Sequence, residues 1–181
     1  MTQPLSELTQ SLLKAARDAG ADAADAMAID TTSLNVDVRG GTLEQAERAE
    51  CSDIGLRVFV GQRVANVSAS DTSQRTIDEM AVRAVAMARE APQDPYAGLA
   101  DADQLTTTRD AAGLELADDT PEPTPAELQA KATEAEARAL AVEGITQVQS
   151  VGGGYTQQQV WLAASNGFEG GYGRTSHGLS C

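Results

Sequence analysis

The 181-residue sequence contains few of the residues from which catalytic and metal sites are usually built. It has one histidine, His177, and two cysteines, Cys51 and Cys181. Two cysteines cannot form a disulfide framework or a four-cysteine zinc site, and a hydrolytic zinc site usually takes more than one histidine. We therefore expect a surface or strand histidine and a structural role for Cys51. The sequence predicts no catalytic, cofactor-binding or metal-binding residue.

Aromatic residues, basic residues and long apolar runs are also scarce. Aromatics make up 3% of the chain, so the core must rely on alanine, valine, leucine and isoleucine. Asp and Glu number 27 against 13 Lys and Arg, a formal net charge of −14. This surplus repels phosphate groups, so we expect neither direct nucleic-acid binding nor docking on anionic lipid. Because no apolar run of about 18 residues and no secretion signal is present, we expect a soluble, cytoplasmic protein without membrane contact.

Apolar residues at steps of three and four predict three helices. The first extends over about 3–19, where Gly20 provides a stop, and the second over about 73–90. The second helix has alternative starts, because Thr76–Glu79 fits a capping box while Asp71 or Ser73 could also cap it. The third begins at Thr124-Pro125-Ala126-Glu127 and is expected to end at Gly144, with an apolar stripe of Leu128, Ala132, Ala135, Ala139 and Val142.

The segments between these helices have the pattern of strands joined by tight turns. Leu34, Val36 and Val38 alternate with polar residues, which is typical of a half-buried strand. Gly40-Gly41, Gly61-Gln62 and Asn166-Gly167 are hairpin signals. The expected strands are 34–38, a possible exposed return strand at 42–50, then 54–60, 63–70, 145–151, 157–165 and 168 onward. The sequence thus predicts an α/β fold of the α+β type, with a mostly antiparallel mixed sheet and about three helices.

The composition changes in the middle of the chain. Residues 90–122 hold nine acids and one base, Arg109, and residues 92–123 hold four of the six prolines. We therefore expect a first α/β module at 1–97, an acidic, proline-containing connecting loop at 98–123, and a second module at 124–181. The chain stops inside an expected strand, so we expect an incomplete second module and a truncated protein. Open strand edges after Leu179 would favour self-association.

Several local patterns have both a functional and a structural interpretation. The glycine runs 152–154 and 170–173 lack the strand–loop–helix context of phosphate-binding loops, so hairpin turns or bulges are favoured. The pairs Asp118-Asp119 and Asp101/Asp103 lie in the acidic loop, where solvated carboxylates make poor general acids. Trp161 is expected to pack in the core rather than to stack on a ligand.

Five segments, in the same order along the chain, carry a family resemblance. They are Asp94–Asp101, Val36–Gly41, Gly55–Arg63, Ser68–Asp71 and Ser165–Phe168. The first closely resembles the segment after the second helix in the PmbA (TldE) branch of the TldD/PmbA family. The others resemble, in turn, its early strand and turn, its main hairpin, the lead into its second helix and its later turn. The resemblance spans about Leu5 to Leu179 and is limited to the N-terminal portion of that family.

The resemblance implies a role in peptide hydrolysis. Members are described as zinc-dependent peptidases of the cytoplasm, named modulators of DNA gyrase, that act on small or unfolded peptides. In the family a TldD-like subunit carries the motif His-Glu-x-x-x-His and pairs with a PmbA/TldE-like subunit that lacks it. The chain contains no such motif, so no catalytic or zinc residue is carried over. The resemblance implies a TldD-like subunit and a peptide substrate as partners, with zinc in that subunit or in a downstream domain.

Two alternatives remain open. The parent protein could be a catalytic TldD-like zinc peptidase whose metal motif lies beyond Cys181. The chain could instead be an acidic interaction module whose Glu90–Glu122 segment binds a basic partner or imitates the charge of DNA.

Overall fold

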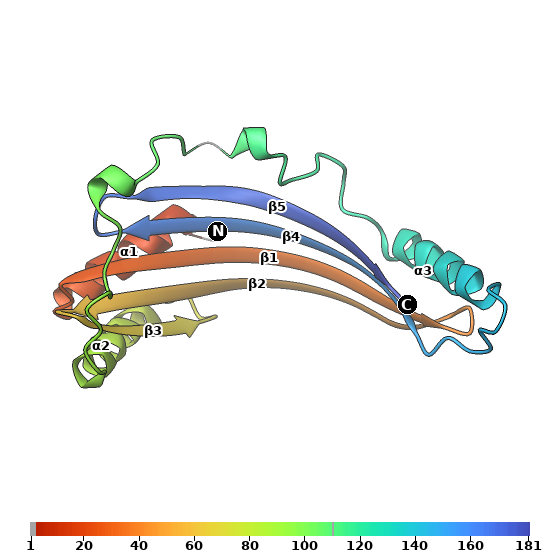
Figure 1. Ribbon diagram of the computed structural model, residues 1–181, viewed down its shortest axis with the longest axis horizontal. Coiled ribbons are helices and arrows are strands. Elements are labelled where there is room, and N and C mark those ends of the chain that lie inside the picture. The colour runs from red at the N-terminus through yellow and green to blue at the C-terminus, as the bar shows by residue number, and fades with distance from the viewer. Residues whose placement is uncertain (1–2, 110) are drawn as a thin grey trace. The chain divides into compact units, whose positions relative to one another are not determined.

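The computed structural model describes residues 3–109 and 111–181, so Asp110 of the acidic segment lies outside the described residues. In the described part of the chain, three α-helices accompany one five-stranded sheet with the strand order β3-β2-β1-β4-β5 (Figure 1). The elements are α1 Leu5–Asp18, β1 Ala23–Arg39, β2 Thr42–Val60, β3 Arg63–Ala69, α2 Gln74–Glu90, α3 Pro125–Leu140, β4 Val151–Ala164 and β5 Glu169–Ser180, with two single 3₁₀ turns at Ala102–Gln104 and Ala112–Leu114.

The sheet is antiparallel, which confirms the predicted α+β fold. β2 pairs with β3 in a register from Ile54 opposite Ala69 to Val60 opposite Arg63. Between β1 and β4, the amide of Ser165 donates to the carbonyl of Ala24, and residues near 158 of β4 meet residues near 31 of β1. Residue numbers therefore rise along one strand as they fall along the other.

Two compact units divide the described chain, and each takes up several separate segments. The first consists of residues 1–30, 51–114 and 159–172, and the second of residues 31–50, 115–158 and 173–181. A compact unit need not fold independently, so this division does not test the predicted modules. The modules at 1–97 and 124–181 with the connecting loop 98–123 stay a prediction.

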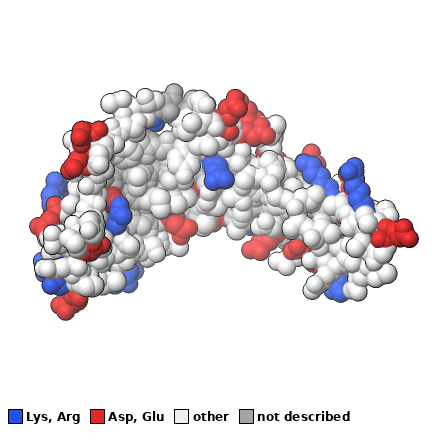
Figure 2. Space-filling model, in the orientation of Figure 1, with Lys and Arg blue, Asp and Glu red and all other residues white. Residues whose placement is uncertain are grey.

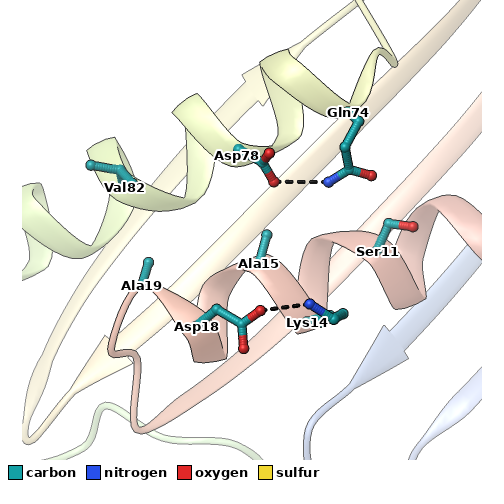
Figure 3. Close-up of a pocket in the computed structure, with 8 residues that line it drawn as sticks. All are labelled: Ser11, Lys14, Ala15, Asp18, Ala19, Gln74, Asp78 and Val82. Carbon is teal, nitrogen blue, oxygen red and sulfur yellow. Dashed lines mark hydrogen bonds and ion pairs between the residues drawn. The ribbon is translucent and has the colours of Figure 1, made fainter.

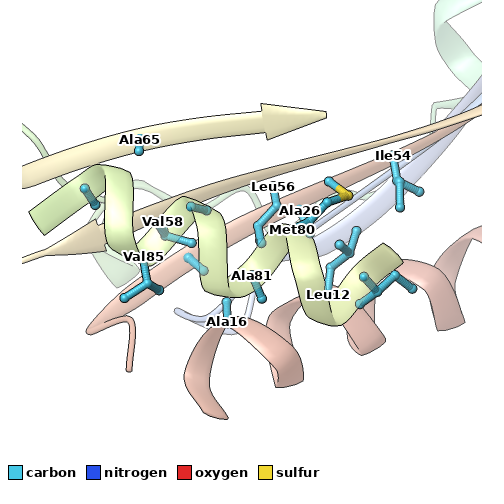
Figure 4. Packing of buried hydrophobic residues seen from close by; sticks show 14 of the residues in the cluster. Leu12, Ala16, Ala26, Ile54, Leu56, Val58, Ala65, Met80, Ala81 and Val85 are labelled. Atoms are coloured by element: carbon cyan, nitrogen blue, oxygen red, sulfur yellow. The ribbon is translucent and has the colours of Figure 1, made fainter. Parts of the chain in front are cut away.

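The first unit has its core between helices α1 and α2 and the strands beside them (Figure 4). α1 contributes Leu8, Leu12 and Ala16, which fall on one face at four-residue steps. Together with Leu56 and Met80 they form a cluster of small and aliphatic side chains, as the low aromatic content requires. Burial of this apolar surface is the main force that holds the helices on the sheet.

Ser73 begins α2. Its hydroxyl accepts a hydrogen bond from the amide of Thr76 at 3.3 Å, and its extended backbone is that of a helix cap. The alternative start at Thr76–Glu79 is therefore wrong, because Thr76 already lies inside the first turn.

The second unit has a smaller core under α3. Leu128 packs with Leu34, Val36 and Tyr155, and Ala132 packs with Val38 and Val151. The predicted start of α3 at Thr124 is confirmed by a capping box: Thr124 Oγ1 accepts from the Glu127 amide at 3.3 Å, and Glu127 Oε2 accepts from the Thr124 amide at 2.7 Å.

The structure corrects the predicted end of α3 and its buried stripe. The helix ends at Leu140, four residues before Gly144, and Val142 is exposed. Ala135, predicted to belong to the buried stripe, is only partly buried, and the neighbouring Glu136 is buried instead. An acid in the stripe was missed because charged residues normally face water.

The predicted strand boundaries also change. Residues 42–50 and 54–60 form one continuous strand, β2, of 19 residues. The predicted strand at 145–151 is wrong apart from Val151, because residues 145–150 have no regular secondary structure and Ile145 is exposed. Gly152–Gly154 lies inside β4 and Gly170–Gly173 inside β5, so the favoured hairpin turns there are wrong as well. No helix in the described chain is long and apolar enough to cross a membrane.

Candidate functional site

The residues that would first be considered for catalysis lie apart from any metal-binding group. His177 is exposed in β5, with its ring centre 5.0 Å from that of Tyr155. Cys51 in β2 and Cys181 after β5 are both exposed. Across residues 3–109 and 111–181, no three His, Cys, Asp or Glu side chains are grouped so that they could hold a metal ion.

Trp161 packs on the neighbouring strand. A Cβ atom at Gly171 would overlap its ring and the carbonyl oxygen of Val160, so glycine at 171 makes room for the indole. The indole Nε1 is buried and has no hydrogen-bond partner among the described residues. Trp161 is only partly buried and lies outside the described core clusters, so it packs on β5 and not in the core as expected. Its ring explains one of the glycines in the run 170–173.

Carboxylates of the acidic segment accept hydrogen bonds that stabilise local turns. Asp101 caps the turn Ala102–Gln104. Asp118 accepts a hydrogen bond from the Thr120 amide at 2.9 Å, which lowers the pKa of its carboxyl group below the ordinary value. Both carboxylates are exposed, and the lowered pKa of Asp118 is the opposite of what a general acid needs.

A buried carboxylate that the sequence analysis missed closes the β1–β2 turn. Glu136, 3% exposed, accepts from the amide of Gly40 at 2.7 Å and from the amide of Gly41 at 2.6 Å. Both glycines have positive φ, 57° and 74°, so their amide groups point the same way and converge on one carboxylate. Glu136 therefore fastens the hairpin turn to α3.

A second polar contact holds the same hairpin. Arg48 of β2 donates to Glu122 through Nε at 2.8 Å and Nη2 at 3.2 Å, and it pairs with Glu50 at 2.6 Å. These contacts raise the pKa of Arg48 and lower that of Glu122. The two-pronged geometry fixes the residues before α3 against the strand.

A shallow trough of 450 Å³ lies where β1, β4 and β5 meet in the second unit. Its floor is Gly152 and Gly154, and a Cβ atom at Gly154 would be 2.9 Å from Oδ1 of Asn35. Asp37 and Ser180 stand beside Gly152 in the same way, at 3.2 Å from its would-be Cβ. Asn35 and Asp37 thus occupy the space that side chains on β4 would fill, which explains the glycines.

A groove of 390 Å³ runs between α1 and α2 (Figure 3). Its charged side chains and Gln74 already pair within each helix: Lys14 bonds Asp18 at 2.7 Å, and Gln74 bonds Asp78 at 2.8 Å. The lysine lowers the pKa of Asp18. These pairs leave the groove without an obvious free charge to recognise a ligand.

A third hollow, of 500 Å³, lies between α1 and the β4–β5 turn. Lys14, Arg17 and Phe168 line it. The guanidinium carbon of Arg109 lies over the Phe168 ring, 5.4 Å from the ring centre. Glu169 lines it as well and accepts a hydrogen bond from Gln10 at 3.3 Å.

On the face that Figure 2 shows, acidic and basic side chains are interspersed, so a phosphate backbone would find no continuous basic surface there.

Two family models match the chain. The model described as PmbA/TldA metallopeptidase domain 1 matches residues 24–88, from β1 to α2. The model described as PmbA/TldA metallopeptidase central domain matches residues 118–181, which hold α3, β4 and β5. The octapeptide Asp94–Asp101 lies between the two matched ranges.

Individual relatives agree with the family models. A curated protein, the metalloprotease PmbA homolog of Haemophilus influenzae, is 32% identical over 114 residues, which cover 63% of this chain and 25% of that protein. The fold is shared with a proposed modulator of DNA gyrase from Bacteroides thetaiotaomicron, at a TM-score of 0.79 and 20% identity, covering 96% of this chain and 39% of that one. It is also shared with TldE from Thermococcus kodakarensis, at a TM-score of 0.73 and 13% identity, covering 95% and 38%. The chain thus spans well under half the length of these relatives. It carries matches to the first and the central domain, in that order, and belongs to the PmbA/TldD metallopeptidase family.

Proposed function

We propose that the chain is the N-terminal region of a PmbA/TldE-like, non-catalytic subunit in a zinc-dependent peptidase complex that acts on small or unfolded peptides. The observation that carries the proposal is the pair of matched domains, the first and the central domain of a metallopeptidase family. The PmbA branch is supported by the 32% identity to the PmbA homologue and by the octapeptide Asp94–Asp101.

In this role the chain contributes structure and contacts to the complex. The zinc ion would belong to a TldD-like subunit, where it supplies an activated water for peptide hydrolysis. In the trough where β1, β4 and β5 meet, the groups that could contact a peptide are neutral or acidic: the amide of Asn35, the carboxylate of Asp37 and the open backbone of the strands. The complex is proposed to work in the cytoplasm.

The first test is the coding sequence downstream of Cys181. The proposal expects the reading frame to continue without a His-Glu-x-x-x-His motif. A motif found there would overturn the proposal and make the parent a TldD-like catalytic subunit. A stop codon directly after Cys181 would also overturn it and leave the acidic interaction module as the explanation.

A further inference from the structure

The first half of β2 is an exposed strand with one open edge. All residues of Thr42–Glu50 are exposed, on both faces of the strand. β3 pairs only with Ile54–Val60, so no strand of the described chain pairs with the outer edge of Thr42–Glu50 (Figure 1). Alternate residues of such an edge turn their amide and carbonyl groups toward the open side, where another strand can bind them.

Contacts elsewhere in the same unit hold this strand in place. Glu136 fixes the Gly40-Gly41 turn through two hydrogen bonds, and Arg48 is bound by Glu50 and Glu122. A peptide that binds to an edge already fixed in the extended form does not have to order it, so little binding energy is lost. The strand is therefore prepared for the addition of a further strand.

The charges along the edge indicate which occupant it fits. Thr42–Glu50 contains three acids and one base, and the base, Arg48, is already paired. Glu44 is near Arg39, at 3.7 Å, whereas Glu47 makes no hydrogen bond or ion pair within residues 3–109 and 111–181. A second copy of this chain would bring the same surplus acids together, which is unfavourable, and a basic strand would compensate them.

We propose that the open edge of β2 over Thr42–Glu50 binds peptides in extended conformation and prefers those with basic side chains. The peptide adds a strand to the sheet, with backbone hydrogen bonds providing affinity and the carboxylate of Glu47 providing the preference. This inference rests on the proposed function, because it assigns this edge a contact with the peptides on which the complex acts.

The experiment uses the 181-residue chain and three capped nine-residue peptides. In the first, lysine alternates with threonine or valine; in the second, glutamate replaces lysine; the third has the charge of the first but contains prolines that prevent strand formation. Binding is measured by calorimetry, and amide hydrogen exchange is followed residue by residue by NMR. We expect only the first peptide to bind and to slow exchange of alternate amides within 42–50 by about tenfold or more.

Two variants test the residue that gives the preference. Glu47→Lys should weaken binding of the lysine peptide about three- to tenfold, since it turns an attraction at an exposed site into a repulsion. Glu143→Lys makes the same change of charge at an exposed position after α3 and should leave binding unchanged. Circular dichroism verifies that both variants are folded.

Three results would overturn the inference. One is equal binding of the proline-containing peptide, which would show attraction by net charge alone. Another is protection confined to residues outside 42–50. The third is protection of 42–50 that grows with protein concentration in the absence of peptide, which would assign the edge to a second copy. Because no zinc-bearing subunit is present in this assay, its failure leaves the proposal of a non-catalytic subunit untouched.

Discussion

Glu136 is the single buried carboxylate in the described part of the molecule, and its role is open to a direct test. Glu136→Ala removes the acceptor for the amides of Gly40 and Gly41. Hydrogen bonds to a charged group are worth about 1.5–3 kcal/mol each, but in the variant the two glycine amides can bind water instead, which reduces the loss. We expect the free energy of unfolding to fall by about 2–4 kcal/mol, measured by urea titration. Glu136→Gln keeps one acceptor oxygen and should lose less; equal losses would contradict the two-bond arrangement.

Gly171 is the residue that lets Trp161 lie flat on β5. Gly171→Ala places a methyl group against the indole and the carbonyl of Val160, and we expect a loss of about 1–3 kcal/mol from overpacking. Trp161 is the sole tryptophan, so its fluorescence reports the displacement directly. Gly178→Ala lies in the same strand with no atom within 4 Å of the added methyl group and is the control. Unchanged fluorescence and stability in Gly171→Ala would show that the indole does not depend on this glycine.

At the scale of the secondary-structure element, the stability that the cap of α3 contributes should depend on pH. The amide and hydroxyl of Thr124 donate to Glu127 and lower the pKa of its carboxyl group below the ordinary 4.5. A lowered pKa in the folded state gives stability that is fully present above the unfolded value and is lost as the pH falls through the folded value. The parent chain should therefore exceed Glu127→Gln in stability at pH 7, and the difference should disappear in acid.

Urea unfolding at several pH values measures this difference. Glu143→Gln is the matched control, because its side chain makes no hydrogen bond among the described residues. A gap between the parent and Glu127→Gln that stays constant down to pH 2 would contradict the cap as the source of the stability.

The elements that sequence could predict are those whose signals are local. Thr124 and Glu127 cap α3 through contacts three residues apart, and the turns at Gly40-Gly41 and Gly61-Gln62 connect adjacent strands. The strand status of Gly152–Gly154 was not predictable, because it depends on Asn35 and Asp37 in a distant segment. Residues 145–150 have β-like composition but find no strand partner, since pairing rather than propensity decides a strand.

The candidate site was less accessible from sequence for the same reason. Glu136 and Arg48 read as solvated charges until tertiary structure brings Gly40, Gly41 and Glu122 to them. The exposure of residues 42–50 could be anticipated from their polar composition, but the open edge could not. It exists because β3 ends at Ala69, opposite Ile54.

At the scale of the whole molecule, the family assignment and the subunit role are separate statements. The matched ranges 24–88 and 118–181 establish the family, whereas the subunit role is a proposal that needs its own test. Under this proposal, a TldD-like partner would decide whether peptides are cut.

The most direct measurement is the zinc content and peptidase activity of the full-length protein encoded by the gene, purified alone and together with the TldD-like subunit of the same organism. The proposal predicts no bound zinc and no cleavage of an unfolded peptide by the protein alone. With the partner it predicts a stable pair that holds about one zinc ion and cleaves the peptide. Stoichiometric zinc and full activity in the protein alone would contradict the non-catalytic subunit.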